Sequence, residues 1–115
     1  ALPQEVPERM KELLEEYHKK STISIKDVAE LHAKFESIHP FQDGNGRVGR
    51  MIILKECLAH DLIPVIIQDN NKPVYMNHLH NAQTRLEFSG LVDYFKTEQD
   101  HYLENTRSFV YEYTE

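Results

Sequence analysis

The spacing of apolar residues is the feature that most constrains how this chain can fold. Between Ser24 and His39, apolar and ring-bearing side chains recur every three or four residues, at Ile25, Val28, Leu31, His32, Phe35 and Ile38. This period predicts an amphipathic α-helix. The Ser24 hydroxyl can cap the start of that helix. Pro40 ends it, because a proline disfavours the helical conformation in the residue before it.

The rest of the chain repeats this helical pattern, with one short exception. The exception is the strand-like run 63–67, which has no partner of similar quality, so we interpret it as a buried connection. Asn71 and Ser89 stand where they could cap two later helices. The sequence therefore predicts an all-α, single-domain bundle of about five helices. Besides the helix that starts at Ser24, these are 8–20 with Pro7 at its start, 47–60, 71–87 and a long last helix from 89 onward.

Composition and charge narrow the class of protein. The 115 residues are enough for one domain, and 40% hydrophobic and 28% charged residues are ordinary for a soluble globular protein. A net charge of −6 argues against general binding to nucleic acid or to an anionic membrane. The single cysteine, Cys57, excludes an internal disulfide and stands in an apolar run, where we expect a buried, inert thiol. We predict a cytoplasmic domain, and Ala1 in place of a methionine suggests a fragment of a longer chain.

The segment from His39 to Arg50 carries the chemistry. It is a short glycine-containing loop that leads directly into the start of a helix, where free backbone N–H groups and the helix dipole favour an anion. Gly44 and Gly46 remove side chains where the backbone turns or approaches a ligand, and successive N–H groups can form a nest for phosphate. Arg47 and Arg50 lie three residues apart, so both can point to one site and bind phosphate oxygens.

Two further residues complete this set. A carboxylate at Asp43 would be repelled by bound polyphosphate unless a divalent cation lay between them, and magnesium is commonly held by one or two carboxylates together with phosphate oxygens. His39, at the edge of the loop, has the side chain best suited to proton transfer near neutral pH. The segment therefore predicts attack on the phosphate of a bound nucleotide.

Each feature also has a simpler interpretation. A glycine-rich loop is usually a turn, a histidine at a helix end is usually a cap, and two arginines in a first turn usually face solvent. Together with the carboxylate at Asp43, these interpretations need four unrelated coincidences within twelve residues. Asp43-Gly44 and Asn45-Gly46 also resemble hairpin turns, but the flanking segments have helical rather than alternating periodicity. The combined functional interpretation is therefore preferred.

This segment resembles the motif of the Fic family, His-Pro-Phe-x-(Asp/Glu)-Gly-Asn-Gly-Arg-x-x-Arg, and matches it at every specified position. The resemblance extends over residues 2–102, and it implies a Fic-like catalytic core spanning 1–115. It further implies roles for the motif residues. His39 would be the general base, Phe41 the buried anchor of the loop and Asp43 the magnesium ligand. The anion hole would come from Gly44, Asn45 and Gly46, and the β- and γ-phosphates would be bound by Arg47 and Arg50.

The implied reaction transfers AMP from ATP, with Mg²⁺, to a Tyr, Thr or Ser hydroxyl of a target protein. Tyr75 resembles an aromatic residue that family members place near the adenine; the alternative is a core tyrosine. Other open alternatives are transfer of phosphate, phosphocholine or a different nucleotide, and a non-enzymatic interaction module. Gly46 favours AMP, because the kinase-like toxin branch has Lys at this position.

Two features of the family are not visible in this sequence. One is a β-hairpin flap that aligns the target and precedes the region at which this chain starts. The other is an inhibitory helix with the pattern (Ser/Thr)-x-x-x-Glu-(Gly/Asn), so we expect any inhibitory helix or partner to lie outside this chain. Ser108 and Glu112 keep part of that spacing, but Tyr113 stands where Gly or Asn belongs. Glu112 is therefore only a weak candidate for an inhibitory glutamate.

Overall fold

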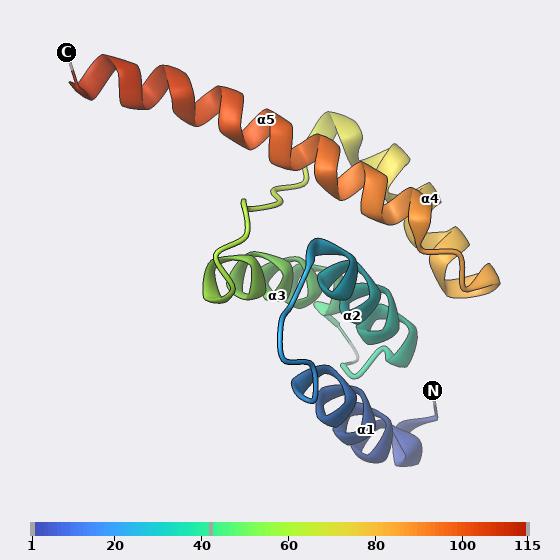
Figure 1. Cartoon of the computed structure of the whole chain (residues 1–115). Coiled ribbons are helices and arrows are strands. Elements are labelled where there is room, and N and C mark those ends of the chain that lie inside the picture. The colour runs from blue at the N-terminus through green and yellow to red at the C-terminus, as the bar shows by residue number, and fades with distance from the viewer. Residues whose placement is uncertain (1, 42, 115) are drawn as a thin grey trace.

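A computed structural model describes residues 2–41 and 43–114, with side chains described as far as residue 107. Over this part of the chain the secondary structure is entirely helical, which confirms the predicted all-α fold (Figure 1). None of these helices is both long and apolar enough to cross a membrane. The α-helices are α1 (Val6–His18), α2 (Ile25–Ile38), α3 (Asn45–Ala59), α4 (Lys72–Arg85) and α5 (Ser89–Thr114), with 3-10 turns at Pro3–Glu5 and Asp69–Asn71.

The ends of α2 are set by local chemistry, as the sequence predicts. Ser24 and Asp27 form a capping box: the Ser24 hydroxyl oxygen accepts from the Asp27 N–H at 3.4 Å, and the Asp27 carboxylate accepts from the Ser24 N–H at 2.9 Å. At the other end, His39 adopts a left-handed conformation with φ of 56°, and Pro40 follows it. The chain therefore leaves α2 abruptly after Ile38, and it begins α3 at Asn45.

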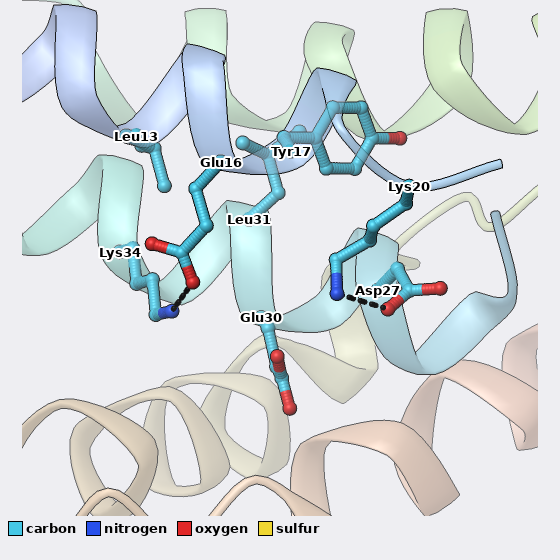
Figure 2. Close-up of a pocket in the computed structure, with 8 residues that line it drawn as sticks. All are labelled: Leu13, Glu16, Tyr17, Lys20, Asp27, Glu30, Leu31 and Lys34. Carbon is cyan, nitrogen blue, oxygen red and sulfur yellow. Dashed lines mark ion pairs between the residues drawn. The ribbon is translucent and has the colours of Figure 1, made fainter.

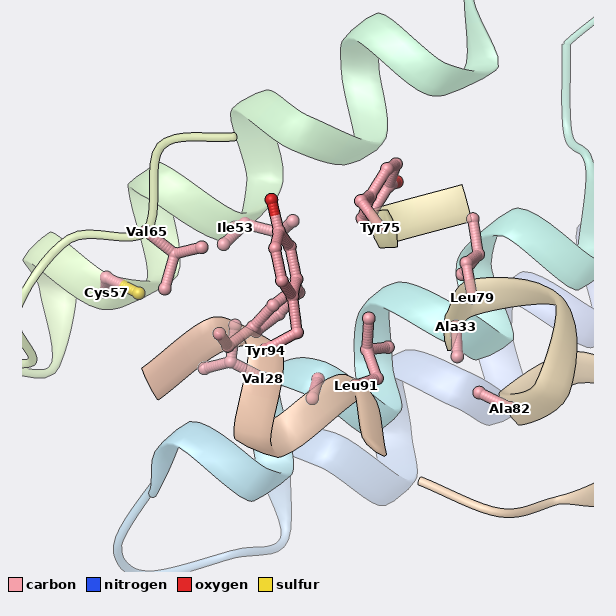
Figure 3. Close-up of a cluster of buried hydrophobic side chains, with 12 residues drawn as sticks. Val28, Ala33, Ile53, Cys57, Val65, Tyr75, Leu79, Ala82, Leu91 and Tyr94 are labelled. Atoms are coloured by element: carbon pink, nitrogen blue, oxygen red, sulfur yellow. The ribbon is translucent and has the colours of Figure 1, made fainter. Parts of the chain in front are cut away.

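One continuous apolar core joins α2, α3, α4 and α5 (Figure 3). The central contributions are Val28 from α2, Ile53 from α3, and Leu91 with Phe95 from α5, each at most 1% exposed. Burying side chains of this size contributes about 1.5–3 kcal/mol each relative to leaving them in water. Cys57 also lies in this core at 0% exposure, and burial raises the pKa of its thiol. The prediction of a buried, inert cysteine agrees with both observations.

Helix α1 packs on the opposite side of α2 through a smaller apolar cluster. A shallow groove runs beside this cluster, and two ion pairs bridge α1 or the residues after it to α2 (Figure 2). The groups in these pairs are partly exposed, so each pair contributes no more than about 1 kcal/mol. The ion pairs are Lys20–Asp27 at 3.3 Å and Lys34–Glu16 at 3.8 Å. The apolar cluster between α1 and α2 comprises Leu13, Tyr17, Leu31, Phe35 and Ile38.

The run 63–67 is an irregular connection, as predicted, but only part of it is buried. Val65 is 3% exposed, whereas Ile66 is 52% exposed. Side chains of α5 hold the flanking backbone: Gln99 donates to the Ile63 carbonyl at 2.7 Å, and the buried Glu98 carboxylate accepts from the Gln68 N–H at 3.4 Å. The connection is therefore attached to the longest helix, whose C-terminal end extends beyond the bundle (Figure 1).

Candidate functional site

The loop that joins α2 to α3 brings the two ends of the motif together. His39 is the last residue before the loop and has φ of 56°, while Gly44 has φ of 81° and directly precedes α3. A positive φ at Gly44 costs little because glycine has no Cβ. Helix α3 then begins at Asn45, two residues earlier than the sequence predicts. The unpaired N–H groups of its first turn consequently fall within the motif, at the positions proposed for an anion.

The side chain of Asn45 holds this loop in place. Its Oδ1 accepts from the Phe41 N–H at 2.9 Å, and its Nδ2 donates to the Phe41 carbonyl at 2.6 Å. The same Nδ2 lies 3.3 Å from both ring nitrogens of His39. Asn45 is only 6% exposed, whereas Phe41 and His39 are exposed, so these contacts are partly buried.

The prediction that Phe41 is the buried anchor of the loop is wrong. Its side chain is 49% exposed. The loop is held instead through the backbone of Phe41, because the Asn45 amide satisfies both its N–H and its carbonyl. An apolar ring in a polar loop suggested burial, but a two-bond amide contact holds the loop without burying that ring.

His39 and Asp43 are both exposed at this corner of the molecule. The Asp43 Oδ1 accepts from the Gly44 N–H at 2.8 Å, which fixes the carboxylate beside the start of α3. No group of three or more His, Cys, Asp or Glu side chains in the described part of the chain could by itself hold a metal ion. A cation at Asp43 would therefore need other ligands, such as phosphate oxygens and water, which commonly complete the coordination of magnesium.

The two motif arginines lie in different surroundings. Arg47 is exposed, whereas Arg50 is partly buried and its guanidinium folds back over the first turn of α3. A Cβ at Gly46 would lie 3.0 Å from an Arg50 guanidinium nitrogen. Gly46 therefore makes room for Arg50. The sequence pattern instead predicted that its missing side chain makes room for a ligand. The arrangement puts the Arg50 charge beside the helix start, where it adds to the attraction for an anion.

Sequence reasoning missed the residues behind Arg50. Glu36 on α2 faces Gly49 on α3, and a Cβ at Gly49 would overlap Oε1 of Glu36 and lie 3.1 Å from Cε1 of His32. Burial raises the pKa of Glu36, and the nearby Arg50 guanidinium opposes this rise. The signal in the sequence is a glycine within an otherwise apolar helix, which often marks close packing against a neighbouring element.

Tyr75 is a core residue, which corrects its assignment to the nucleotide site. Its side chain is 1% exposed, and its hydroxyl lies 2.6 Å from Nε2 of His32. Burial raises the pKa of this hydroxyl, and Arg50 acts against the rise. A ring enclosed on both faces cannot stack on adenine, so the alternative interpretation of Tyr75 as a core tyrosine is the correct one. The side chain of Glu112, the weak candidate for inhibition, lies outside the described residues.

Comparison with known proteins identifies the family to which this chain belongs. The model of the Fic/DOC family matches residues 1–57, which include the complete motif and the two helices before it. The chain belongs to the Fic/DOC family. The Fic resemblance drawn from the motif is thereby confirmed.

Curated relatives of the chain include proteins from distant organisms. The chain is 31% identical over 83 residues to protein adenylyltransferase fic-1 of Caenorhabditis elegans, and this match covers 70% of the chain but 16% of that protein. It is 33% identical over 82 residues to a probable protein adenylyltransferase of Aquifex aeolicus, covering 70% of the chain and 25% of that protein. A third relative, protein adenylyltransferase Fic of Aedes aegypti, is 38% identical over 58 residues, with 50% of the chain and 12% of that protein covered. The chain thus spans a quarter or less of the length of these relatives.

Proposed function

We propose that this chain is the catalytic core of a protein adenylyltransferase, which transfers AMP from ATP to a hydroxyl group of a target protein. The observation that carries the proposal is the folded corner of the motif. There the His39 ring lies against Asn45, the first residue of α3, with Asp43 and the left-handed Gly44 immediately before that helix. The names of the relatives, all protein adenylyltransferases, favour AMP over phosphate or phosphocholine as the transferred group.

In this proposal the polyphosphate binds at the start of α3. The backbone N–H groups of Asn45 and Gly46 would surround the phosphate oxygens, since such groups and the helix dipole attract anions. The Gly44 N–H, which donates to the Asp43 carboxylate in this structure, would join them once that carboxylate bound Mg²⁺ instead. Arg47 would bind the β-phosphate and Arg50 the γ-phosphate through charge-assisted hydrogen bonds. Asp43 would hold Mg²⁺, which when bound neutralises charge on the phosphates. The fit of Asp43 rests on its exposure and on its fixed position beside Gly44.

His39 would then accept the proton of the incoming Tyr, Thr or Ser hydroxyl. A new bond forms between the hydroxyl oxygen and the α-phosphorus, and the bond from that phosphorus to the bridging oxygen of the β-phosphate breaks, so pyrophosphate leaves. Most of the rate enhancement would come from positioning of the reactants and from charge stabilisation. The exposure of His39 supports this role, because a target side chain can reach it from solvent.

The test is to incubate the full natural protein that contains this chain with Mg²⁺ and ATP labelled on the α- or the γ-phosphate. The proposal expects the α-label to reach a protein target. Transfer of only the γ-label would mean that phosphate is the transferred group. If neither label is transferred while ATP still binds at the motif, the chain is an interaction module instead.

A further inference from the structure

The amide of Asn45 has a defined orientation. The Phe41 N–H can only donate and the Phe41 carbonyl can only accept, so the atom 2.9 Å from the N–H must be the amide oxygen and the atom 2.6 Å from the carbonyl must be the amide nitrogen. Phe41 therefore determines the positions of both the oxygen and the nitrogen of the Asn45 amide. The nitrogen that donates to Phe41 is the same atom that contacts His39.

The contact of Asn45 with His39 is made to the face of the ring. Nδ2 lies 3.3 Å from both Nδ1 and Nε2. An atom equally distant from both nitrogens and lying in the ring plane would collide with a ring carbon, so this amide nitrogen lies above or below the plane. The contact is an N–H group against an aromatic face, which is weak but directional. Among the described residues, this is the hydrogen-bonding contact found for the ring nitrogens, so it leaves their in-plane directions open to a proton donor.

From these contacts we propose that Asn45 is a positioning residue for His39 and that its side chain is not a phosphate ligand. Its amide, fixed by Phe41, supports one face of the imidazole and directs the edge of the ring toward the incoming hydroxyl. The burial of Asn45 at 6% supports this role, because little of the side chain remains for contact with a nucleotide. The proposal rests on the proposed function, in which His39 is the general base.

The test uses Asn45→Ala and Asn45→Ser in the full natural protein, with Asn77→Ala as the matched control. Asn77 is an exposed asparagine on α4. Serine is too short to bridge to Phe41, but it is well tolerated at a helix start and adds no charge, so this variant keeps the fold if alanine does not. Three quantities are compared: kcat for AMP transfer, Kd for MgATP by calorimetry, and the NMR signals of the His39 ring.

Both Asn45 variants are expected to lower kcat by about 10- to 100-fold, since small displacements of a reacting group have effects of this size. The Kd for MgATP should change by less than about threefold, and the His39 ring signals should shift or broaden. Asn77→Ala should match the wild type in all three. A large rise in Kd with unchanged His39 signals would overturn the proposal and make Asn45 a phosphate ligand; unchanged kcat would also overturn it. If the wild type transfers no AMP, the proposed function fails, and the His39 signals alone decide this inference.

Discussion

The hydroxyl oxygen of Tyr75 lies 2.6 Å from Nε2 of His32, and the two rings pack between α2 and α4 with centroids 5.7 Å apart. His32 is 1% exposed, and this burial lowers the pKa of its imidazole from 6.5 to about 4, with the Gly49 backbone opposing the change and the Arg50 charge adding to it. The ring is therefore neutral at physiological pH and can accept the Tyr75 proton at Nε2. A neutral pair of this kind links α2 to α4 behind the motif loop.

This pair predicts a pH dependence of stability. The unfolded chain takes up a proton at His32 below pH 6.5, whereas the folded chain does so only near pH 4. The free energy of unfolding should therefore fall as the pH drops through this window, by up to about 3 kcal/mol. Urea unfolding followed between about pH 7 and pH 4.5 measures this loss. In His32→Gln, whose amide oxygen can still accept from Tyr75, the slope should be flatter; an unchanged slope would exclude His32 as its source.

A second prediction concerns Gly49, whose missing side chain admits Glu36 and His32. In Gly49→Ala the new Cβ would overlap Oε1 of Glu36, so we expect a loss of about 1–3 kcal/mol in the free energy of unfolding even though alanine is the better helix former. In a Glu36→Ala background the loss should be smaller, because only the 3.1 Å contact with His32 remains. Thermal or urea unfolding of the four proteins in this cycle gives the coupling energy. Additive effects would mean that the two residues do not meet.

How well an interaction could be predicted from the sequence depends on how far apart its two residues lie along the chain. The capping box at Ser24 and the left-handed Gly44 involve residues at most three apart, and the sequence predicted a helix start and a turn at these places. Tyr75 and His32 are 43 residues apart, so only the packing of α4 on α2 brings them together. The sequence pattern could not distinguish a tyrosine that bonds within the core from one that faces a nucleotide.

The loop itself was predicted in outline and missed in detail. The motif indicated that residues 39–50 form one site, and the structure brings His39, Asp43 and the start of α3 to one corner. How the loop is held depends on whether an amide or an aromatic ring makes the anchoring contact. Both residue types occur in the motif, and only the observed exposure of Phe41 and burial of Asn45 decide between them. The role of Glu36 was missed because it depends on the space beside Gly49 on another helix.

A third prediction tests whether Arg50 binds the terminal phosphate. Arg50→Ala should weaken ATP binding by about ten- to a hundredfold, the loss expected for a charge-assisted contact of about 1.5–3 kcal/mol. AMP binding should be nearly unchanged, since AMP lacks that phosphate. Calorimetry with both nucleotides measures the difference, and Arg107→Ala, an exposed arginine on α5, is the control. Equal losses for ATP and AMP would show that Arg50 acts elsewhere on the nucleotide.

The most direct test of the central claim is AMP transfer by His39→Ala in the full natural protein, measured with ATP labelled on the α-phosphate. His39 ends α2 and faces solvent, and in the proposed reaction it acts on the incoming hydroxyl and not on ATP. The account predicts a fold and a Kd for MgATP close to those of the wild type, with transfer reduced by about 10²–10⁴-fold, the usual contribution of a positioned base. If His39 were only a helix cap, the variant would lose about 1 kcal/mol of stability or less and keep its activity. Transfer at the wild-type rate by a folded His39→Ala protein would contradict the account.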